Sequence, residues 1–263
     1  MKIAMLQAAS IPLNYAENLH QLDQAMQQAR TQGADLLITP EMFLSGYVLK
    51  EQTQYMAEML PLVKVQQLAK AHQLALILGA PRETEQGIFN STYFIGDQGE
   101  LLNVYDKTHL FGDVDRQQFI AGQTPVVITT YHNIKIAMLI CYDVEFPETV
   151  RAAAQAGAHL VAVATAQMQP FSFVNKHLIA TRAWENQVYV AYVNQIGHEQ
   201  PFEYVGLTTL AAPNGEVIAQ ASETQATLLF AQISAEQVQK AQQNNPYLHD
   251  LRQDLFMDLA KLA

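Results

Sequence analysis

The chain opens with an alternation of short apolar runs and longer stretches of helical periodicity. Residues 2–8 and 34–39 are short and mostly apolar, which predicts buried β-strands. Between them, residues 18–31 carry apolar or small side chains at helical spacing, with polar side chains interspersed. Gly33 follows at the position where a glycine commonly ends a helix. The pattern therefore predicts a strand, a helix and a second strand.

The alternation continues along the rest of the chain, with a block of consecutive strands in the middle. Residues 53–72 have a helical pattern that we expect to break or restart at Pro61, because proline lacks the backbone N–H that a helix uses. Residues 74–78 then complete a β-α-β-α-β beginning, which favours an α/β architecture. The further predicted strands are residues 89–95, 101–105, 126–130, 134–140, 159–165, 188–194, 207–211, 217–219 and 226–233. The further predicted helices are residues 147–156, 173–186 and 235–243.

Composition supports a folded protein and excludes several functional classes. Hydrophobic residues make up 49% of the 263 residues, which excludes intrinsic disorder. The formal charge of −10 argues against a nucleic-acid partner, and no apolar stretch reaches the roughly 18 residues needed to span a membrane. No linker-like segment divides residues 1–263, so we expect a single domain. The single cysteine, Cys141, excludes an intramolecular disulfide and fits a reducing compartment, so we expect a cytoplasmic protein.

Cys141 is the most informative candidate for chemistry, because the common nucleotide-binding, serine-hydrolase and metal-binding motifs are absent from the sequence. It follows the apolar run 134–140 and precedes Pro147, which suits the first turn of a helix. Cys141 is therefore expected at the carboxyl end of a strand and near a helix N-terminus, where ligands bind in open α/β sheets and where a thiolate is favoured. The alternative is an inert buried cysteine.

Two further residues are predicted at strand ends and would complement a nucleophilic thiol. Glu41 follows the strand at residues 34–39, and Lys107 follows the strand at residues 101–105. A carboxylate near Cys141 could accept its proton, and a nearby ammonium group could stabilise a developing oxyanion. Sequence spacing leaves open whether the three residues meet, since each alone is more often part of a solvated ion pair.

Three segments in this order resemble the Glu, Lys and Cys motifs of the nitrilase superfamily of carbon–nitrogen hydrolases, in its amidase-like branch. The segments are residues 38–47 (ITPEMFLSGY), 106–112 (DKTHLFG) and 141–148 (CYDVEFPE). Further matches occur at residues 182–186, 206–208, 213–215 and 245–252, so the resemblance covers nearly the whole chain.

The resemblance implies a four-layer αββα sandwich and a covalent two-step hydrolysis of amides. By this resemblance Cys141 is the nucleophile, Glu41 the general base, Lys107 the oxyanion-stabilising cation, and the backbone N–H of Tyr142 a second oxyanion donor. The implied reaction proceeds through a thioester and uses no metal ion and no organic cofactor. Family members usually form homodimers or higher homo-oligomers through helices near the active site and through the C-terminal tail. In this chain that tail begins at about residue 244.

One departure from the family pattern concerns a second acidic residue. Many members carry a glutamate eight residues after the lysine, where this chain has Asp115. The charge is kept, but the side chain is one methylene shorter, so a direct contact could become water-mediated or require a shifted backbone. We include Asp115 as a candidate catalytic residue. The alternative is a solvated aspartate beside Arg116.

The residues after the cysteine favour some substrates over others. Relatives that act on N-carbamoyl amino acids or ω-amides often have arginine here, whereas this chain has Val144 and Glu145. This disfavours an anionic substrate and indicates a small neutral or amine-bearing carboxamide. Tyr142 and Asp143 stand where nitrile-specific members tend to have Trp-Glu, so an amidase is preferred to a nitrilase. An ω-amidase, an acyltransferase and a catalytically idle binding module remain alternatives. The candidate substrate-binding residues, for some of which core packing is an equal alternative, are Tyr142, Glu145, Phe146, Tyr47 and Thr165.

Overall fold

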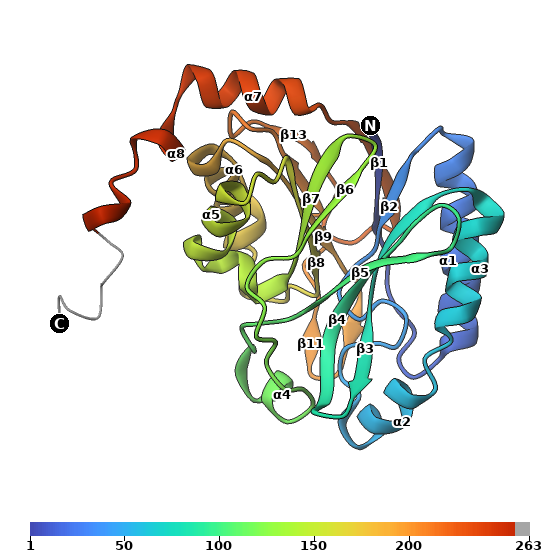
Figure 1. Ribbon diagram of the computed structural model, residues 1–263. Helices are drawn as coiled ribbons and strands as arrows, with labels where there is room; N and C mark the ends of the chain where they lie inside the picture. The colour runs from blue at the N-terminus through green and yellow to red at the C-terminus, as the bar shows by residue number, and fades with distance from the viewer. Residues whose placement is uncertain (256–263) are drawn as a thin grey trace.

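Two six-stranded β-sheets face each other at the centre of the computed structural model, which describes residues 1–255 (Figure 1). The first sheet has the strand order β14-β1-β2-β3-β4-β5, and the second has the order β13-β12-β9-β8-β7-β6. Helices α1 and α3 cover the outer face of the first sheet, and α5 and α6 cover that of the second (Figure 1). The layers therefore follow the helix, sheet, sheet, helix order that the resemblance implies.

Both sheets have a parallel centre with antiparallel strands at their edges. The strands of the first sheet are β1 (Lys2–Gln7), β2 (Leu36–Ile38), β3 (Ala75–Thr84), β4 (Gly87–Ile95), β5 (Leu101–Asp106) and β14 (Thr227–Gln232). Those of the second sheet are β6 (Ile128–Tyr131), β7 (Ile134–Ile140), β8 (Leu160–Thr165), β9 (Tyr189–Asn194), β12 (Thr209–Ala211) and β13 (Val217–Gln220). A small separate hairpin is formed by β10 (His198–Glu199) and β11 (Phe202–Glu203).

The helices include two long ones and several short ones. They are α1 (Tyr15–Thr31), α2 (Thr53–Glu58), α3 (Leu62–His72), α4 (Gly112–Arg116), α5 (Pro147–Gln155), α6 (Ile179–Asn186), α7 (Ala235–Asn244) and α8 (Tyr247–Asp250). Shorter helical turns cover Lys50–Gln52, Cys141–Glu145, Val174–Leu178 and Gln253–Leu255. In this part of the chain no helix is long and apolar enough to cross a membrane.

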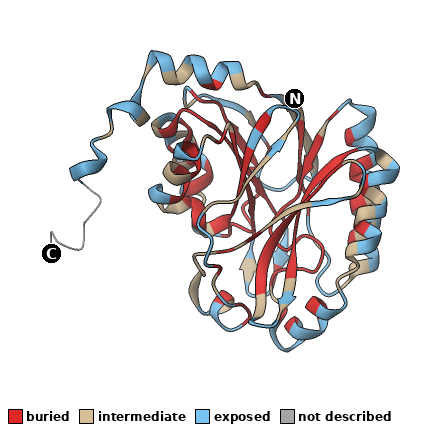
Figure 2. Ribbon diagram, viewed as in Figure 1, coloured by how far each residue is buried: buried red, intermediate tan, exposed pale blue. Residues whose placement is uncertain are grey.

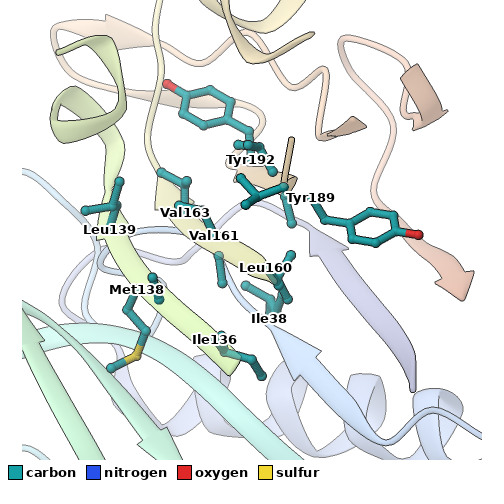
Figure 3. Close-up of a cluster of buried hydrophobic side chains, with 14 of the residues drawn as sticks. Ile38, Ile136, Met138, Leu139, Leu160, Val161, Val163, Tyr189 and Tyr192 are labelled. Carbon is teal, nitrogen blue, oxygen red and sulfur yellow. The ribbon is translucent and has the colours of Figure 1, made fainter. Parts of the chain in front are cut away.

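Side-chain alternation along the strands builds apolar layers on both faces of each sheet. In β1, Ile3 and Met5 pack between the two sheets with side chains of β7, β8 and β9, whereas Ala4 and Leu6 pack against α1 and α3. Figure 2 shows the result as buried strands with exposed outer helix faces. Figure 3 shows part of the apolar core on both faces of the second sheet, including Ile38 of β2 near Leu160 of β8. The burial of this shared layer fixes how the strand ends of the two sheets meet.

The expected elements are found, with differences at several boundaries. The helical stretch breaks at Pro61, which caps α3, and the predicted strand at residues 74–78 runs on as β3 through Gly79 and Pro81 to Thr84. The expected helix at residues 173–186 begins with a wider π-helical turn over Val174–Leu178. Helix α4 and the β10–β11 hairpin were not predicted, because they are too short to show a periodicity.

Candidate active site

Three charged side chains form a fully buried cluster where the two sheets meet. The ammonium Nζ of Lys107 donates to Glu41 Oε1 and to Asp115 Oδ2, at 2.7 Å in each case. All three side chains have 0% exposure. Glu41 follows β2, Lys107 follows β5 and Asp115 lies on α4, so the fold brings together residues far apart in the chain. The contact from Lys107 to Asp115 is direct, despite the shorter side chain.

Both oxygens of the Glu41 carboxylate are held in place. Asn90 Nδ2 of β4 donates to Oε1 at 2.7 Å, and the backbone N–H of Ala166 donates to Oε2 at 2.9 Å. The backbone of Glu41 also bonds across the sandwich, because its N–H donates to Thr165 O at 3.3 Å and its carbonyl accepts from Gln195 Nε2 at 2.9 Å. Glu41 is thus fixed to the second sheet although it comes from the first.

Asp115 is anchored by three donors besides its position on α4. In addition to Lys107, the Tyr47 hydroxyl donates to Oδ1 at 2.8 Å and the Phe111 N–H donates to Oδ2 at 2.8 Å. The Tyr47 segment is itself held by Glu199, which accepts from the backbone N–H of Tyr47 at 2.9 Å and of Val48 at 2.8 Å. A buried carboxylate that is hydrogen-bonded on both oxygens gives Lys107 a fixed direction.

Cys141 is placed by a strained turn directly after β7. Its φ of +44° lies in the left-handed region that non-glycine residues rarely adopt. It is the first residue of the turn Cys141–Glu145, and its side chain is 6% exposed. Arg182 of α6 supports this turn, because its Nε donates to Val144 O at 2.9 Å and its Nη2 donates to Glu145 O at 2.6 Å.

Asp143 ties the turn of Cys141 to the segment that carries Lys107. Its Oδ2 accepts from the Ile140 N–H at 3.1 Å and from the Tyr105 hydroxyl at 2.9 Å. Its Oδ1 accepts from the Thr108 hydroxyl at 2.8 Å and from the His109 N–H at 2.8 Å. One carboxylate therefore contacts the residue before Cys141 and residues on both sides of Lys107.

Burial and charge together set the protonation of these groups. Burial raises the pKa of the Cys141 thiol well above its usual value, and the Glu41 charge adds to this, while Lys107 acts in the opposite direction. Burial also raises the pKa of Glu41 against the effect of Lys107. For Lys107 burial lowers the pKa, but Asp115 and Glu41 raise it by more, so the group stays an ammonium. Burial thus opposes the effect expected of the helix N-terminus and favours the thiol form of Cys141.

The candidate substrate-binding residues fall into two groups, of which the first is partly exposed and the second is buried. Tyr142 and Phe146 form an aromatic pair with ring centroids 5.0 Å apart, and Phe146 also stacks on His109 at 4.1 Å. Glu145 accepts from Gln167 Nε2 at 3.1 Å, and burial raises the pKa of its carboxyl group. The remaining two candidates, Tyr47 and Thr165, are almost fully buried, at 1% and 0% exposure.

Sequence reasoning missed three residues that the structure places around the cluster. They are Asn90 on the Glu41 carboxylate, Gln195 on the Glu41 carbonyl, and Asp143 between the two segments. A signal existed for Asn90, because the run Asn90, Ser91 and Thr92 interrupts an otherwise apolar strand and all three are fully buried. Buried polar side chains in a strand need partners, and such partners are often found at functional sites.

Comparison with protein families gives this geometry a context. The family described as carbon-nitrogen hydrolase matches residues 2–243. The chain belongs to this family. The match extends over almost the whole chain and confirms the resemblance to the nitrilase superfamily seen in the sequence.

Similar proteins place this carbon–nitrogen hydrolase beside amidases. It is 41% identical over 266 residues to the "Hydrolase in pqqF 5'region" of Pseudomonas protegens, with 99% of this chain and 92% of the relative covered. It is 31% identical over 256 residues to the (R)-stereoselective amidase of Pseudomonas sp., with 96% and 92% covered.

A solved structure extends the likeness to the fold and to cysteine chemistry. A glutamate-to-glutamine mutant of the amidase from Nesterenkonia sp. AN1 has a TM-score of 0.89 and 31% identity, with 98% of this chain and 96% of that chain covered. That structure shows covalent addition of the acetamide moiety of fluoroacetamide at its active site cysteine. The two-sheet α/β fold flanked by helices is thereby confirmed, and the hydrolase is an enzyme of the amidase and nitrilase type.

Proposed function

We propose that this hydrolase is a cysteine amidase that converts small neutral or amine-bearing carboxamides to the carboxylic acid and ammonia. The observation that carries the proposal is the buried contact of Lys107 with Glu41 and Asp115. Glu41 and Lys107 are both close enough to Cys141 to shift the pKa of its thiol. The directions of the pKa shifts support this chemistry, because burial favours the thiol form of Cys141 and raises the pKa of Glu41, while the two carboxylates favour the charged form of Lys107.

The proposed reaction has two balanced steps. Glu41 accepts the thiol proton while the sulfur of Cys141 attacks the amide carbon, and the developing oxyanion is stabilised by Lys107 and the N–H of Tyr142. Glu41 then gives the proton to the leaving nitrogen, so that ammonia departs and a thioester remains. A water molecule that loses a proton to Glu41 attacks the thioester, the acid is released, and Glu41 returns that proton to the sulfur of Cys141.

Charge around Cys141 supports the proposed substrate class. The Glu41, Asp115 and Glu145 carboxylates lie around one ammonium group, that of Lys107, which is electrostatically coupled to all three. The whole chain also carries a formal charge of −10. An excess of negative charge repels carboxylate-bearing substrates and attracts ammonium groups. This argues against an ω-amidase, whose substrates carry a carboxylate.

Ammonia release from a panel of amides and nitriles tests the proposal. We expect the wild type to release ammonia, C141A to be inactive, and E41Q to lose activity by at least about 10²-fold, the size of a general-base contribution. E148Q is the matched control, because Glu148 is exposed in the first turn of α5. Full activity in C141A would contradict the proposal. Consumption of nitriles instead of amides would indicate a nitrilase, and hydroxamate formation that exceeds hydrolysis would indicate an acyltransferase.

The substrate class has its own test. We expect the wild type to prefer propionamide and β-alaninamide to succinamate, and E145Q to improve the kcat/KM for succinamate relative to propionamide. E148Q again serves as the control for a lost surface charge. A wild type that prefers succinamate would overturn the substrate class and leave the amidase assignment intact.

A further inference from the structure

Two buried hydroxyl groups lie behind the Cys141 turn without a partner. Thr165 ends β8 and Tyr192 lies in the adjacent strand β9, and both side chains are 0% exposed. Neither Thr165 Oγ1 nor Tyr192 Oη has a hydrogen-bond partner among residues 1–255. A buried hydroxyl without a partner costs free energy, so two of them beside one nucleophile call for an explanation.

The strand register brings these hydroxyl groups to the cysteine. Strand β8 pairs in parallel with β7, which leads into Cys141, and with β9, in which Asn194 is the partner of Thr165. Thr165 is near enough to the sulfur of Cys141 for its hydroxyl to lower the pKa of the thiol. The Tyr192 phenol in turn lies beside the Thr165 hydroxyl and within the electrostatic reach of Cys141. The Thr165 hydroxyl therefore lies between the Tyr192 phenol and the sulfur of Cys141.

This arrangement leaves hydrogen-bonding capacity unused in the resting thiol. A hydroxyl group can rotate to donate to a thiolate or to accept from another hydroxyl, and hydrogen bonds to charged groups are the stronger ones. Hydrogen bonds at catalytic groups are often poorly aligned before the substrate binds and improve as charge develops. When Glu41 removes the proton from Cys141, the sulfur becomes the acceptor that Thr165 lacks.

We propose that Tyr192 is a positioning residue that orients the Thr165 hydroxyl to donate a hydrogen bond to the sulfur of Cys141 as its negative charge develops. The inference rests on the proposed role of Cys141 as the nucleophile. Glu41 remains the proton acceptor, and Thr165 and Tyr192 keep their own protons throughout. The same donor stabilises the sulfur when it departs as the thioester is hydrolysed.

Alkylation of Cys141 measures this effect without any knowledge of the natural substrate. Cys141 is the only cysteine, so iodoacetamide labelling followed by intact mass gives a single-site rate. We expect T165V to lower the labelling rate about ten-fold at pH values below the thiol pKa, which corresponds to one pKa unit, and Y192F to lower it about three-fold. In both variants the pH profile of labelling should shift to higher pH. The other titratable groups that are electrostatically coupled to the sulfur are the same in both variants and the wild type. They are Glu41, Lys107, Tyr47 and Tyr204, while Glu145 is coupled to Tyr192.

A double variant separates a positioning role from two independent effects. If Tyr192 acts through Thr165, Y192F should change the labelling rate less than two-fold in the T165V background. Y189F is the matched control, because Tyr189 lies in the same strand but its hydroxyl bonds Gln237 of α7, and Figure 3 shows its ring directed away from that of Tyr192. Equal labelling in T165V and the wild type overturns the inference, as does an undiminished effect of Y192F in the T165V background.

A second Thr165 variant and the steady-state kinetics distinguish the proposed hydrogen bond from a purely structural role of Thr165. T165S restores the hydroxyl and should recover labelling to within about three-fold of the wild type, whereas a purely structural role for the methyl group predicts no recovery. If T165V does not fold, Y192F against Y189F carries the same test. With an amide that the wild type hydrolyses, T165V should lower kcat and keep KM within two-fold of the wild-type value. Failure of the wild type to release ammonia overturns the proposed function, whereas normal hydrolysis with unchanged labelling in T165V overturns only this inference.

Discussion

Lys107 shows how a buried charge can be kept in a protein interior. An isolated ammonium with no solvent contact would lose its proton, because burial disfavours the charged form. Two carboxylates at 2.7 Å reverse this, and each of them is held by further donors. Burial keeps the pKa of Glu41 high, and the Asp115 charge adds to this, while Lys107 acts in the opposite direction. A single residue change in the cluster should therefore shift the pH dependence of the enzyme.

Asp115 provides the residue-scale prediction. Its charge raises the pKa of Glu41, so D115N should lower that pKa. Since Glu41 must be ionised to accept a proton, activity falls as pH drops through its pKa, and the acid limb of kcat/KM should move to lower pH in D115N. The plateau should also fall about 10²-fold, because Lys107 and Tyr47 lose a fixed partner. The pH profile of D113N, which alters an exposed aspartate on the same helix, should match the wild type. An unshifted acid limb in D115N would show that Asp115 does not set the proton affinity of Glu41.

At the scale of elements, strand β3 passes directly beneath the turn that carries Glu41. A Cβ atom at Gly79 would lie 2.4 Å from Pro40 O, 2.6 Å from Met42 N and 2.9 Å from Glu41 Cα. A Cβ atom cannot come this close to backbone atoms, so the Glu41 turn would have to move. Gly79 is thus the residue that lets β2 and β3 pack closely enough to place the base.

G79A should therefore impair catalysis as well as stability. We expect kcat to fall about 10²-fold, since displacement of a catalytic group by about 1 Å is enough for such a loss. G33A is the control, because a Cβ there meets no atom within 4 Å and only the left-handed backbone is strained. Ammonia release and thermal unfolding, measured together, check this. A G79A variant with normal kcat would mean that the Glu41 turn tolerates the shift.

The segments after β5 and β7 are joined by an ion pair that responds to pH. This pair consists of His109 and Asp143. The hydrogen bond between them raises the pKa of His109 above 6.5, although burial opposes the shift. The stabilisation is therefore fully present below pH 6.5 and is lost as pH rises through the raised pKa. The melting temperature of H109Q should lie below that of the wild type at pH 5.5, with the gap closing by pH 9. H20Q, which alters an exposed histidine on α1, should show no such gap, and a constant gap in H109Q would indicate packing alone.

Long elements could be predicted from the sequence, whereas the contacts that complete the site could not. Alternation in residues 2–8 and the break at Pro61 follow from local chemistry, and the three motifs pointed to Glu41, Lys107 and Cys141. Strand β3 was cut short because Gly79 and Pro81 usually end a strand, but its pairing with β4 carries it onward. The polar run at Asn90 marks a buried polar position, but the partners of Asn90 and Asp143 lie 49 and 38 residues away, and a local pattern does not identify partners at such separations.

At the scale of the whole molecule, the face formed by α6 and the tail carries exposed aromatic side chains. Trp184 is 45% exposed and Tyr247 is 39% exposed, with their ring centroids 6.2 Å apart. Such exposed aromatic residues are typical of interfaces. We take this face as the candidate for the homodimer that the family resemblance implies. The end of that tail, residues 256–263, lies outside the described residues.

Trp184 tests that assembly. We expect the wild type to sediment as a dimer, and W184E to sediment as a monomer at micromolar concentration, because a charge would be buried without a partner. Y55E is the matched control, since Tyr55 is 56% exposed on α2, beside the first sheet. Sedimentation velocity distinguishes the species. A monomeric wild type would exclude the dimer, and a dimeric W184E would place the interface elsewhere.

The base and the nucleophile are supplied by opposite halves of the sandwich, Glu41 after β2 and Cys141 after β7. Their alignment depends on how the halves slide past one another, and a shear of about 1 Å would uncouple them while every strand kept its own hydrogen bonds. The turnover rate should then report such sliding more sensitively than circular dichroism does. On mild heating or in dilute urea, the turnover rate would decrease before the ellipticity changes from its native value.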